Sequence, residues 1–506
     1  MKYSTEKSGS LSEDKKIACR NDIHQNCDTC AEMNLHKISL VEKENIFFLM
    51  DGCTCDPFVI NHNAYTILSA LKKGTDKKKL IEDFGEAIVT NTLKSLQTLQ
   101  KSDNDHDRLL HYEDACKTIS NFRNEKISLL QCLLMVVQSC NLACSYCYGG
   151  DSGQYHMKGF MSKSMAEKCF HYFLSNSPDN MDIKLLFVGG EPLLNMEVIE
   201  HVIDLWEKLK YKYPYKKLSF ALTTNGTLLT PSITAYLIEK KVSLAISLDG
   251  PEDIHNRNRI FKNGQGTFNS VMAGIELLRM YKAPFVVRVT ISRHTDLDRL
   301  FDFLGKQNFD ATYISTVDYP MLKPDKDYQL DMDAYNQLSK KQQELLHDGC
   351  RDILEGKKGT FQAKQMGIAY HRMIRRNKAG FPFKCLAGWH ICTFGIKGDI
   401  YLCQSFVGNE RFCLGNVNKG IDKEKVVKLY MDFLNASRMC DSCWALPMCE
   451  RSCFYQKAKP AGGFDSIPED ICNIYRDNIA SMMVRTAELQ KHKYGSKTNQ
   501  DIKMPI

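Results

Sequence analysis

Three cysteines crowd one short stretch of the sequence. Cys140, Cys144 and Cys147 are spaced C-x3-C-x2-C and follow directly on the apolar run QCLLMVVQ. Thiolates bind iron and zinc well, and a four-iron cluster has four ligand positions. The spacing therefore predicts a metal centre in which three protein thiolates leave one position open. A zinc site and a chance grouping are the alternatives.

Composition limits the classes of protein that this chain can belong to. A length of 506 residues predicts two to four domains, and 21 cysteines in a large chain indicate metal binding or catalysis rather than disulfides. A net charge of +7 is modest for this length, and nucleic-acid binding is not predicted. The sequence lacks an apolar run of ~18 residues and an apolar signal core, which predicts a cytoplasmic protein without a membrane span.

The elements that position the three cysteines are predicted between residues 125 and 320. Strand and helix patterns alternate there, and an α/β fold with a partial (β/α)6 TIM-type barrel is expected. The expected strands are QCLLMVVQ, IKLLFV, KLSFALT, SLAISL, FVVRVTIS and ATYIST. Active sites in such folds collect at the carboxyl ends of the strands, which is where the three cysteines fall.

The cysteine spacing, followed by an aromatic residue and glycines, resembles the radical S-adenosylmethionine (SAM) superfamily. The resemblance implies that SAM fills the open iron position, with Tyr146 near the adenine, the GGEP motif at the SAM ammonium, Ser247 at the ribose and Arg259 at the carboxylate. The implied SAM-contacting residues are Tyr146, Gly189, Gly190, Glu191, Pro192, Thr224, Asn225, Ser247, Asp249 and Arg259. They stand in order after successive predicted strands, which structure alone does not explain.

A second group of cysteines crowds residues 376–480 and resembles the seven-cysteine SPASM domain. The resemblance implies two auxiliary four-iron clusters, hence three [4Fe-4S] clusters in all. The first auxiliary cluster is implied to bind Cys385, Cys403 and Cys453, and the second Cys440, Cys443, Cys449 and Cys472. Cys392 is extra, and both a fourth ligand of the first cluster and a buried thiol stay open. Cys413 falls in a predicted strand and is expected in the core.

The remaining segments complete the domain plan. Residues 1–34 are a polar tail, in which Cys27 and Cys30 have zinc-compatible spacing without a second pair nearby. Residues 35–115 show three short strands followed by helices and resemble the PqqD-like peptide-recognition domain, a winged helix-turn-helix in which an edge strand pairs with a leader peptide. A nonspecific α+β cap and a nucleic-acid winged helix are the alternatives. Residues 321–375 are expected to form a helical bridge, and residues 481–506 a tail.

These resemblances together imply a maturase of ribosomally made peptides, similar to sactipeptide and ranthipeptide synthases. The implied reaction removes a hydrogen atom from the peptide through a 5′-deoxyadenosyl radical and joins a cysteine sulfur to carbon as a thioether. The implied partners are a precursor peptide, with its leader on the N-terminal domain, and a one-electron reductant such as flavodoxin or ferredoxin. A carbon–carbon crosslinking cyclase and a formylglycine-generating sulfatase-maturing enzyme are the alternatives. No general base is assigned; Asp318 follows the sixth strand as a loop acid only.

Overall fold

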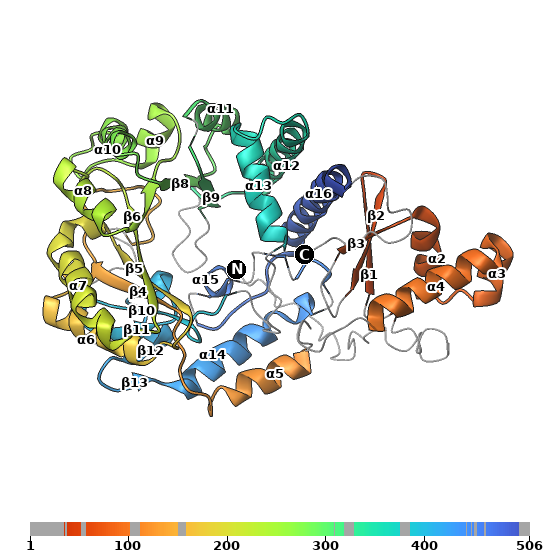
Figure 1. The fold of residues 1–506 in the computed structure, drawn as a ribbon, viewed down its shortest axis with the longest axis horizontal. Helices are drawn as coiled ribbons and strands as arrows, with labels where there is room; N and C mark the ends of the chain where they lie inside the picture. Colours follow the sequence, from red (N-terminus) through yellow and green to blue (C-terminus); the bar gives the residue numbers. More distant parts are fainter. Residues whose placement is uncertain are drawn as a thin grey trace, which may run out of the picture. The chain divides into compact units, whose positions relative to one another are not determined.

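The computed structural model describes most of the chain, and its parts fall into two compact units (Figure 1). The described residues are 35, 38–51, 57–101, 112–149, 158–307, 309–317, 328–374, 385–441, 443–446, 448, 449, 453–459 and 462–494. The polar tail with Cys27 and Cys30, and the loop acid Asp318, lie outside them. The first unit comprises residues 1–108 with 498–505, and the second comprises most of residues 109–497.

The first unit has the predicted order of strands and helices. Its described elements are β1 (Ile38–Lys43), β2 (Ile46–Asp51), β3 (Pro57–Ile60), α2 (His62–Lys72), α3 (Lys77–Phe84) and α4 (Glu86–Lys101). The strands form an antiparallel sheet in the order β1-β2-β3. Glu44 and Asn45 both take left-handed φ angles in the two-residue turn between β1 and β2, as a tight hairpin requires. Asn61 and Asp76 cap the two following helices.

The six strands predicted in the second unit are confirmed, and all of their pairings are parallel. They are β4 (Gln131–Val137), β5 (Asp182–Gly189), β6 (Lys217–Thr224), β7 (Ser243–Ser247), β8 (Phe285–Ile291) and β9 (Thr312–Thr316). The connecting helices include α6 (Lys163–Ser175), α7 (Met196–Leu209), α8 (Pro231–Glu239), α9 (Glu252–Asn258), α10 (Phe268–Met280) and α11 (Leu297–Gln307). Figure 1 shows α6, α7, α8 and α10 along the outer face of the curved sheet.

This sheet continues beyond β4 into the cysteine-rich region, which the sequence had suggested as a separate domain. Within the described residues it has ten strands, because four more follow on the far side of β4. They are β10 (Ile391–Phe394), β11 (Asp399–Tyr401), β12 (Cys413–Asn416) and β13 (Gly420–Ile421). β10 pairs with β4 in parallel and the others follow in antiparallel order. Alternating residues of β4 pack in two different core clusters, Cys132 and Leu134 in one and Leu133 and Met135 in the other, which explains why the strand is a continuous apolar run that is buried almost throughout.

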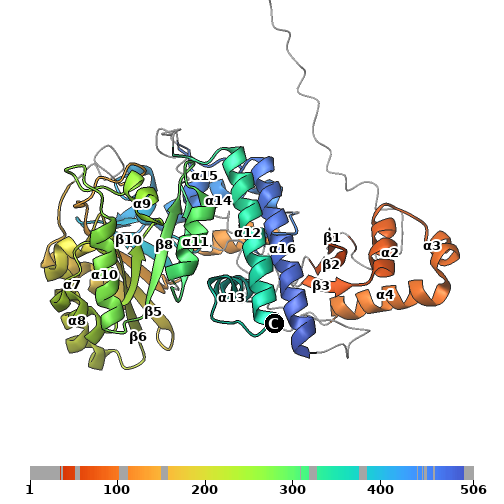
Figure 2. The ribbon, with the colours of Figure 1, turned by 90° about the horizontal axis from the view of Figure 1, so that it is seen from above.

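The remaining helices are α5 (Tyr112–Asn121), α12 (Met332–Leu354), α13 (Phe361–Ile374), α14 (Lys423–Asn435), α15 (Phe454–Lys457) and α16 (Glu469–Tyr494). Within residues 321–375, for which the sequence predicts a helical bridge, the described part forms the helices α12 and α13. Figure 2 shows α12 and α16 side by side, and these helices share extensive contacts.

Two predicted segment boundaries need correction. The tail expected from residue 481 is wrong up to Tyr494, because α16 continues through this point and buries Met483 and Val484. The apolar spacing of its buried face, which also holds Ile479 and Ala480, simply continues across the expected boundary. In addition α5 begins before residue 115 yet belongs to the second unit. No helix among the described residues has the length and apolar character needed to cross a membrane.

Candidate active site and cysteine groups

The three clustered cysteines lie in a loop at the carboxyl end of β4, as predicted. A later segment of the chain holds this loop in place. The backbone N–H of Ala143 donates to the carbonyl of Ile260 at 2.8 Å, and that of Ser145 donates to the carbonyl of Asn258 at 2.9 Å. The segment after α9 therefore acts as a partner strand for the cysteine loop, a role that the sequence does not reveal.

The thiols of this loop lie close enough to influence one another. Burial raises the pKa of Cys140 to about 11 and that of Cys144 to about 12, and each is raised further by the charge of Cys147. Cys147 itself is exposed, so the group opens towards solvent. Buried thiols with such pKa values become thiolates only when a strong positive charge is bound, and iron supplies it. The donor set thus fits a four-iron cluster with three protein ligands.

Glycines at the end of β5 let this strand approach the cysteine loop. A Cβ atom on Gly189 would lie 2.4 Å from the carbonyl oxygen of Val137, and one on Gly190 would lie 2.4 Å from that of Ser139. The resemblance to radical SAM proteins implies that Gly189 and Gly190 let the backbone approach SAM closely. The structure adds a tighter constraint, which is close packing against the backbone that leads into Cys140.

Gly190→Ala is expected to displace the cysteine loop and to lower the free energy of unfolding by about 2 kcal/mol, because backbone atoms cannot yield to the added methyl group. Gly305→Ala is the matched control, since this glycine lies in α11 with nothing within 4 Å of its Cβ position. The control should gain roughly 0.5–1 kcal/mol. Urea unfolding and iron content per chain check both variants. Equal stability of the two would contradict the packing argument.

Glu191 is fully buried just behind the cysteine loop and caps the short helix η2 (Pro192–Asn195). Its carboxylate accepts hydrogen bonds from the Leu193 N–H at 3.0 Å, the Thr224 hydroxyl at 2.7 Å and the Asn225 N–H at 2.7 Å. Burial nevertheless raises the pKa of Glu191 to about 7, against the lowering effect of these donors. The predicted SAM-contacting residues Glu191, Thr224 and Asn225 are therefore brought together, and in the structure they bind one another.

The raised pKa of Glu191 makes stability depend on pH. Because the native carboxyl group binds its proton more tightly than the unfolded one, the unfolding free energy is highest below pH 4.5 and falls as the pH rises through about 7. Deprotonation of Glu191 alone should lower the unfolding free energy by about 3 kcal/mol between pH 4.5 and about 7. Glu191→Gln lacks the titration, so wild-type stability should decline relative to the variant as pH rises. Urea unfolding of the iron-free proteins checks this, and a difference that is independent of pH would contradict it.

An amide network surrounds the first cysteine of the loop. The Asn225 side chain donates to the Asn141 side-chain oxygen at 2.9 Å and faces the Cys140 sulfur at 3.9 Å. The Asn141 amide in turn donates to the Thr227 hydroxyl at 2.8 Å. Amide donors next to a sulfur favour its thiolate form, so Asn225 is placed to stabilise the Cys140 thiolate.

Asp249 and Arg259, both predicted to contact SAM, form a buried ion pair. The Arg259 Nε donates to the Asp249 carboxylate at 2.8 Å, and the guanidinium lies over the Tyr146 ring at 5.5 Å from its centre. The Tyr146 hydroxyl donates to the same carboxylate, whose other oxygen accepts the Thr290 N–H at 2.9 Å. Asp249 therefore orients Arg259 and Tyr146. Ser247, at the end of β7, lies half-buried beside this group.

His255 is a buried part of this site that the sequence did not point out. Its Nδ1 accepts the backbone N–H of Asp249 at 3.2 Å, and its Nε2 lies 2.9 Å from the Thr267 hydroxyl. Thr267 donates to the carbonyl of Arg259 at 2.9 Å, so Nε2 carries the hydrogen and the ring is neutral. Burial lowers the pKa of His255 to about 4, in keeping with this state. A lone histidine in a helix gives no sequence signal for such a role.

Cys385, Cys403 and Cys453, called here the first auxiliary group, lie close enough to influence one another. The charge of Cys453 raises the pKa of both Cys385 and Cys403, after the larger effect of burial. Cys453 directly precedes α15, which carries Tyr455, and the ring centre of Tyr455 lies 6.2 Å from that of Tyr148 in the cysteine loop. The first auxiliary group and the cysteine loop therefore lie on neighbouring parts of one structure.

The sequence leaves two alternatives open for Cys392, a fourth ligand of the first cluster and a buried thiol, and its complete burial favours the buried thiol. It is fully buried on β10, pairs with Cys132 of β4 and faces Cys169 of α6. The parallel pairing of β10 with β4 places its side chain in the core between sheet and helices, which sequence spacing cannot reveal. Cys413 is on β12 as predicted and is half-buried.

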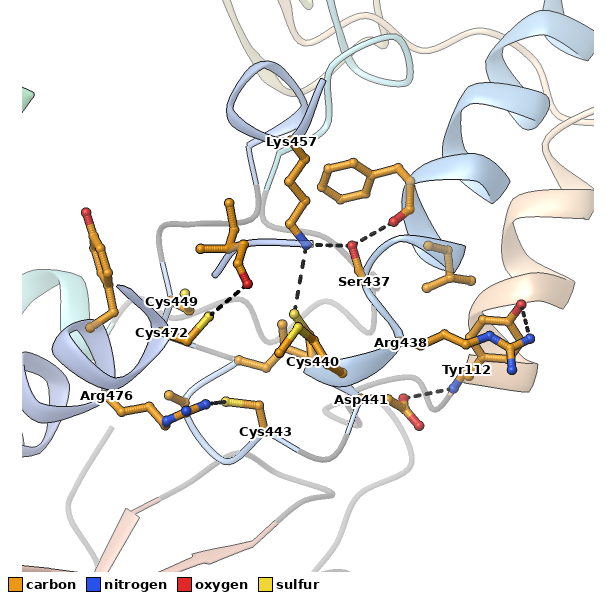
Figure 3. A pocket seen from close by; sticks show the side chains of 17 residues that line it. Tyr112, Ser437, Arg438, Cys440, Asp441, Cys443, Cys449, Lys457, Cys472 and Arg476 are labelled. Carbon is orange, nitrogen blue, oxygen red and sulfur yellow. Dashed lines mark hydrogen bonds between the residues drawn. The ribbon is translucent and has the colours of Figure 1, made fainter. Parts of the chain in front are cut away.

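The second auxiliary group lines a pocket, shown in Figure 3. Its members are Cys440, Cys443, Cys449 and Cys472. Two cations approach these sulfurs, because Lys457 Nζ lies 3.9 Å from the Cys440 sulfur and Arg476 lies 3.8 Å from that of Cys443. No group of three or more His, Cys, Asp or Glu side chains in the described ranges converges on a single ion. Cluster ligands need not converge in this way, because each thiolate binds a different iron atom.

Comparison with known proteins decides the family of the central domain. Residues 134–304 match the model of the Radical SAM superfamily, and this span holds β5 to β8 with the whole cysteine loop. This part of the chain belongs to the Radical SAM superfamily. A radical SAM domain implies one four-iron cluster and SAM, in agreement with the donor set described above. The chain is accordingly a radical SAM enzyme.

Some relatives of this radical SAM enzyme match it over most of its length. It is 25% identical over 380 residues to a cysteine-type anaerobic sulfatase-maturating enzyme of Clostridium novyi (strain NT), covering 70% of this chain and 96% of that protein. It is 22% identical over 479 residues to the radical SAM cyclopropyl synthase TigE of Paramaledivibacter caminithermalis, covering 88% and 94%. The solved structure of native anSMEcpe with bound AdoMet and Cp18Cys peptide shares the fold, with a TM-score of 0.59, 22% identity and coverage of 72% and 99%.

Proposed function

We propose that this radical SAM enzyme forms thioether crosslinks between cysteine sulfur and carbon in a ribosomally made precursor peptide. The observation that carries the proposal is the make-up of the first auxiliary group. Cys385, Cys403 and Cys453 lie together, while Cys392 is buried in the core and the second group has four cysteines of its own. Among the described residues, a cluster on the first group would have one iron without a protein thiolate, and that iron suits the thiolate of a substrate cysteine.

The chemistry balances with the cofactors that these groups would hold. Cys140, Cys144 and Cys147 would hold the cluster, which would supply the one electron needed to split SAM into methionine and the 5′-deoxyadenosyl radical. Overall one C–H and one S–H bond are replaced by one C–S bond. One hydrogen atom leaves in 5′-deoxyadenosine, the other leaves as a proton, and one electron needs an acceptor. Two auxiliary clusters, for three [4Fe-4S] clusters in all, supply that acceptor, and a flavodoxin or ferredoxin supplies the first electron.

The residues around the radical SAM cluster have separate roles in this proposal. The Asp249 carboxylate holds Arg259 and Tyr146, which are the proposed contacts for the carboxylate and adenine of SAM. The GGEP motif shapes the backbone at the proposed ammonium site, and Ser247 is the proposed ribose contact. All of these side chains follow the carboxyl ends of parallel strands, so that SAM would lie across the sheet edge next to the cysteine loop.

The first unit is the proposed site for the leader of the precursor. Its antiparallel sheet has β1 and β3 at its edges within the described residues, and an edge strand can pair with an extended peptide through main-chain hydrogen bonds. The TigE match supports a role beyond the radical SAM domain. Over 479 residues it is longer than the whole of residues 109–497 and therefore extends into the first unit. The PqqD-like identity of this unit and its leader-binding role are part of the proposal.

A cysteine-replacement series in the precursor tests the proposal. The enzyme is coexpressed anaerobically with a candidate precursor, a small cysteine-containing peptide, and with variants of this peptide in which each cysteine in turn is changed to serine. One crosslink, that is the loss of two hydrogens, should disappear for each cysteine removed. An unchanged number of crosslinks in every variant would favour carbon–carbon linkage and would contradict thioether formation.

Sulfatase maturation is the second candidate, because several relatives are cysteine-type anaerobic sulfatase-maturating enzymes. Conversion of cysteine to formylglycine removes the sulfur atom, whereas thioether formation keeps it. A synthetic sulfatase-derived cysteine peptide, incubated anaerobically with enzyme, SAM and reductant, separates the two by mass. Loss of sulfur from that peptide would support maturation of sulfatases, and an unmodified peptide would argue against it.

A further inference from the structure

A buried lysine faces the second auxiliary group of cysteines. Lys457 is only 4% exposed at the end of α15, and its ammonium donates to the Ser437 hydroxyl at 2.7 Å (Figure 3). Ser437 passes its own hydrogen to the carbonyl of Phe433 at 2.6 Å, and the Phe433 ring lies 5.0 Å from the ammonium. The ammonium of Lys457 also faces the Cys440 sulfur, which lies 3.9 Å away.

The ammonium of Lys457 forms no ion pair with a carboxylate among the described residues, whereas nearby cations do. Lys459, two residues on, is partly exposed and pairs with Asp465 at 3.1 Å. Arg476, the other cation at this pocket, pairs with Glu469. Burying an ammonium without a counter-charge is costly, so a position such as that of Lys457 calls for an anion.

A four-iron cluster on Cys440, Cys443, Cys449 and Cys472 would be that anion. Four thiolates outweigh the positive charge of the cluster core, and the net negative charge grows by one on reduction. A fixed positive charge beside one ligand sulfur stabilises the reduced state more than the oxidised state, and the surrounding low dielectric strengthens the effect.

We infer that Lys457 is the built-in counter-charge of the second auxiliary cluster and raises its reduction potential. The inference rests on the proposed second auxiliary cluster. The helix α15 connects the two auxiliary groups. It begins directly after Cys453 of the first group, and its last residue, Lys457, lies at the second group. A higher potential at the second cluster draws the electron released during crosslinking away from the first. Lys457 is thus a positioning residue for charge and need not touch the peptide.

The experiment uses the full chain with Cys140, Cys144 and Cys147 changed to alanine, so that only auxiliary clusters contribute to the spectra. Lys457→Met removes the charge, Lys457→Gln keeps a hydrogen-bond donor without charge, and Lys457→Arg keeps the charge. Lys459→Met is the matched control for loss of a lysine on the same segment. Each protein is reconstituted anaerobically, its iron is counted, and its clusters are titrated with reductant while electron paramagnetic resonance is recorded.

In Lys457→Met and Lys457→Gln, the ratio of reduced to oxidised cluster at a fixed solution potential should fall at least tenfold for one cluster, a shift of ~59 mV. Lys457→Arg and Lys459→Met should keep the parent value. Loss of one cluster's iron in both neutral variants, with retention in Lys457→Arg, would also support the counter-charge. If the neutral variants keep their full iron content and the parent reduction potentials, the role of Lys457 would be overturned, while the proposed second cluster would stand. If the parent protein binds iron for a single cluster only, and Cys443→Ala leaves this iron content unchanged, the proposed second cluster itself would be contradicted.

Discussion

Replacing Cys144 by alanine is expected to reduce the formation of 5′-deoxyadenosine to the rate seen without enzyme. Cys144 is one of three clustered thiols at the carboxyl end of β4, and the positive charge of Arg259 also acts on it. Its loss leaves two thiolates for a cluster that needs three. The product is measured by chromatography after anaerobic incubation with SAM and a chemical reductant.

Cys116→Ala is the control for this variant, because Cys116 is a half-buried thiol on α5 outside all three cysteine groups. It should keep wild-type SAM cleavage. Continued formation of 5′-deoxyadenosine by Cys144→Ala at the wild-type rate would show that the radical SAM cluster is not bound by this loop.

Replacing Cys443 by alanine should separate the two halves of the reaction. The variant should keep a measurable rate of SAM cleavage, since Cys443 belongs to the second auxiliary group and not to the SAM-cluster loop. Crosslinked peptide should fall below detection, because the electron released during bond formation loses its acceptor. Both products are measured in one anaerobic incubation with the precursor peptide.

Cys413→Ala provides the comparison, since Cys413 lies half-buried on β12 and belongs to neither auxiliary group. This control should retain both activities. Full crosslinking by Cys443→Ala would mean that the second group takes no part in the reaction. Loss of SAM cleavage to the level of Cys144→Ala would instead indicate a damaged fold.

Local patterns in the sequence were sufficient for much of this fold. The six strands of the radical SAM domain are apolar runs bounded by helices with caps, and each signal lies within a few residues of the strand it defines. The cysteine loop follows β4 and the GGEP motif lies at the end of β5. Because these two strands are consecutive in the predicted parallel sheet, the sequence could predict that the loop and the motif lie together at one edge of it. The grouping of the auxiliary cysteines followed from the SPASM resemblance rather than from any local pattern.

Other features depend on contacts between distant parts of the chain. β10 pairs with β4 across more than 250 residues, and only this pairing buries Cys392 against Cys132. The support of Arg259 by Asp249, and of both by His255, likewise arises from the fold around α9. In the sequence Lys457 looks like an ordinary surface lysine. The residues next to it give no sign that α15 directs its side chain into a pocket.

Mass spectrometry of the precursor peptide tests the proposed thioether chemistry most directly. The peptide is coexpressed anaerobically with the enzyme, reduced, and weighed before and after thiol alkylation. Thioether formation predicts the loss of two hydrogens for each crosslinked cysteine, and those cysteines should resist alkylation even after reduction. Loss of hydrogens with every cysteine still alkylated would contradict it and would point to carbon–carbon linkage or another oxidation.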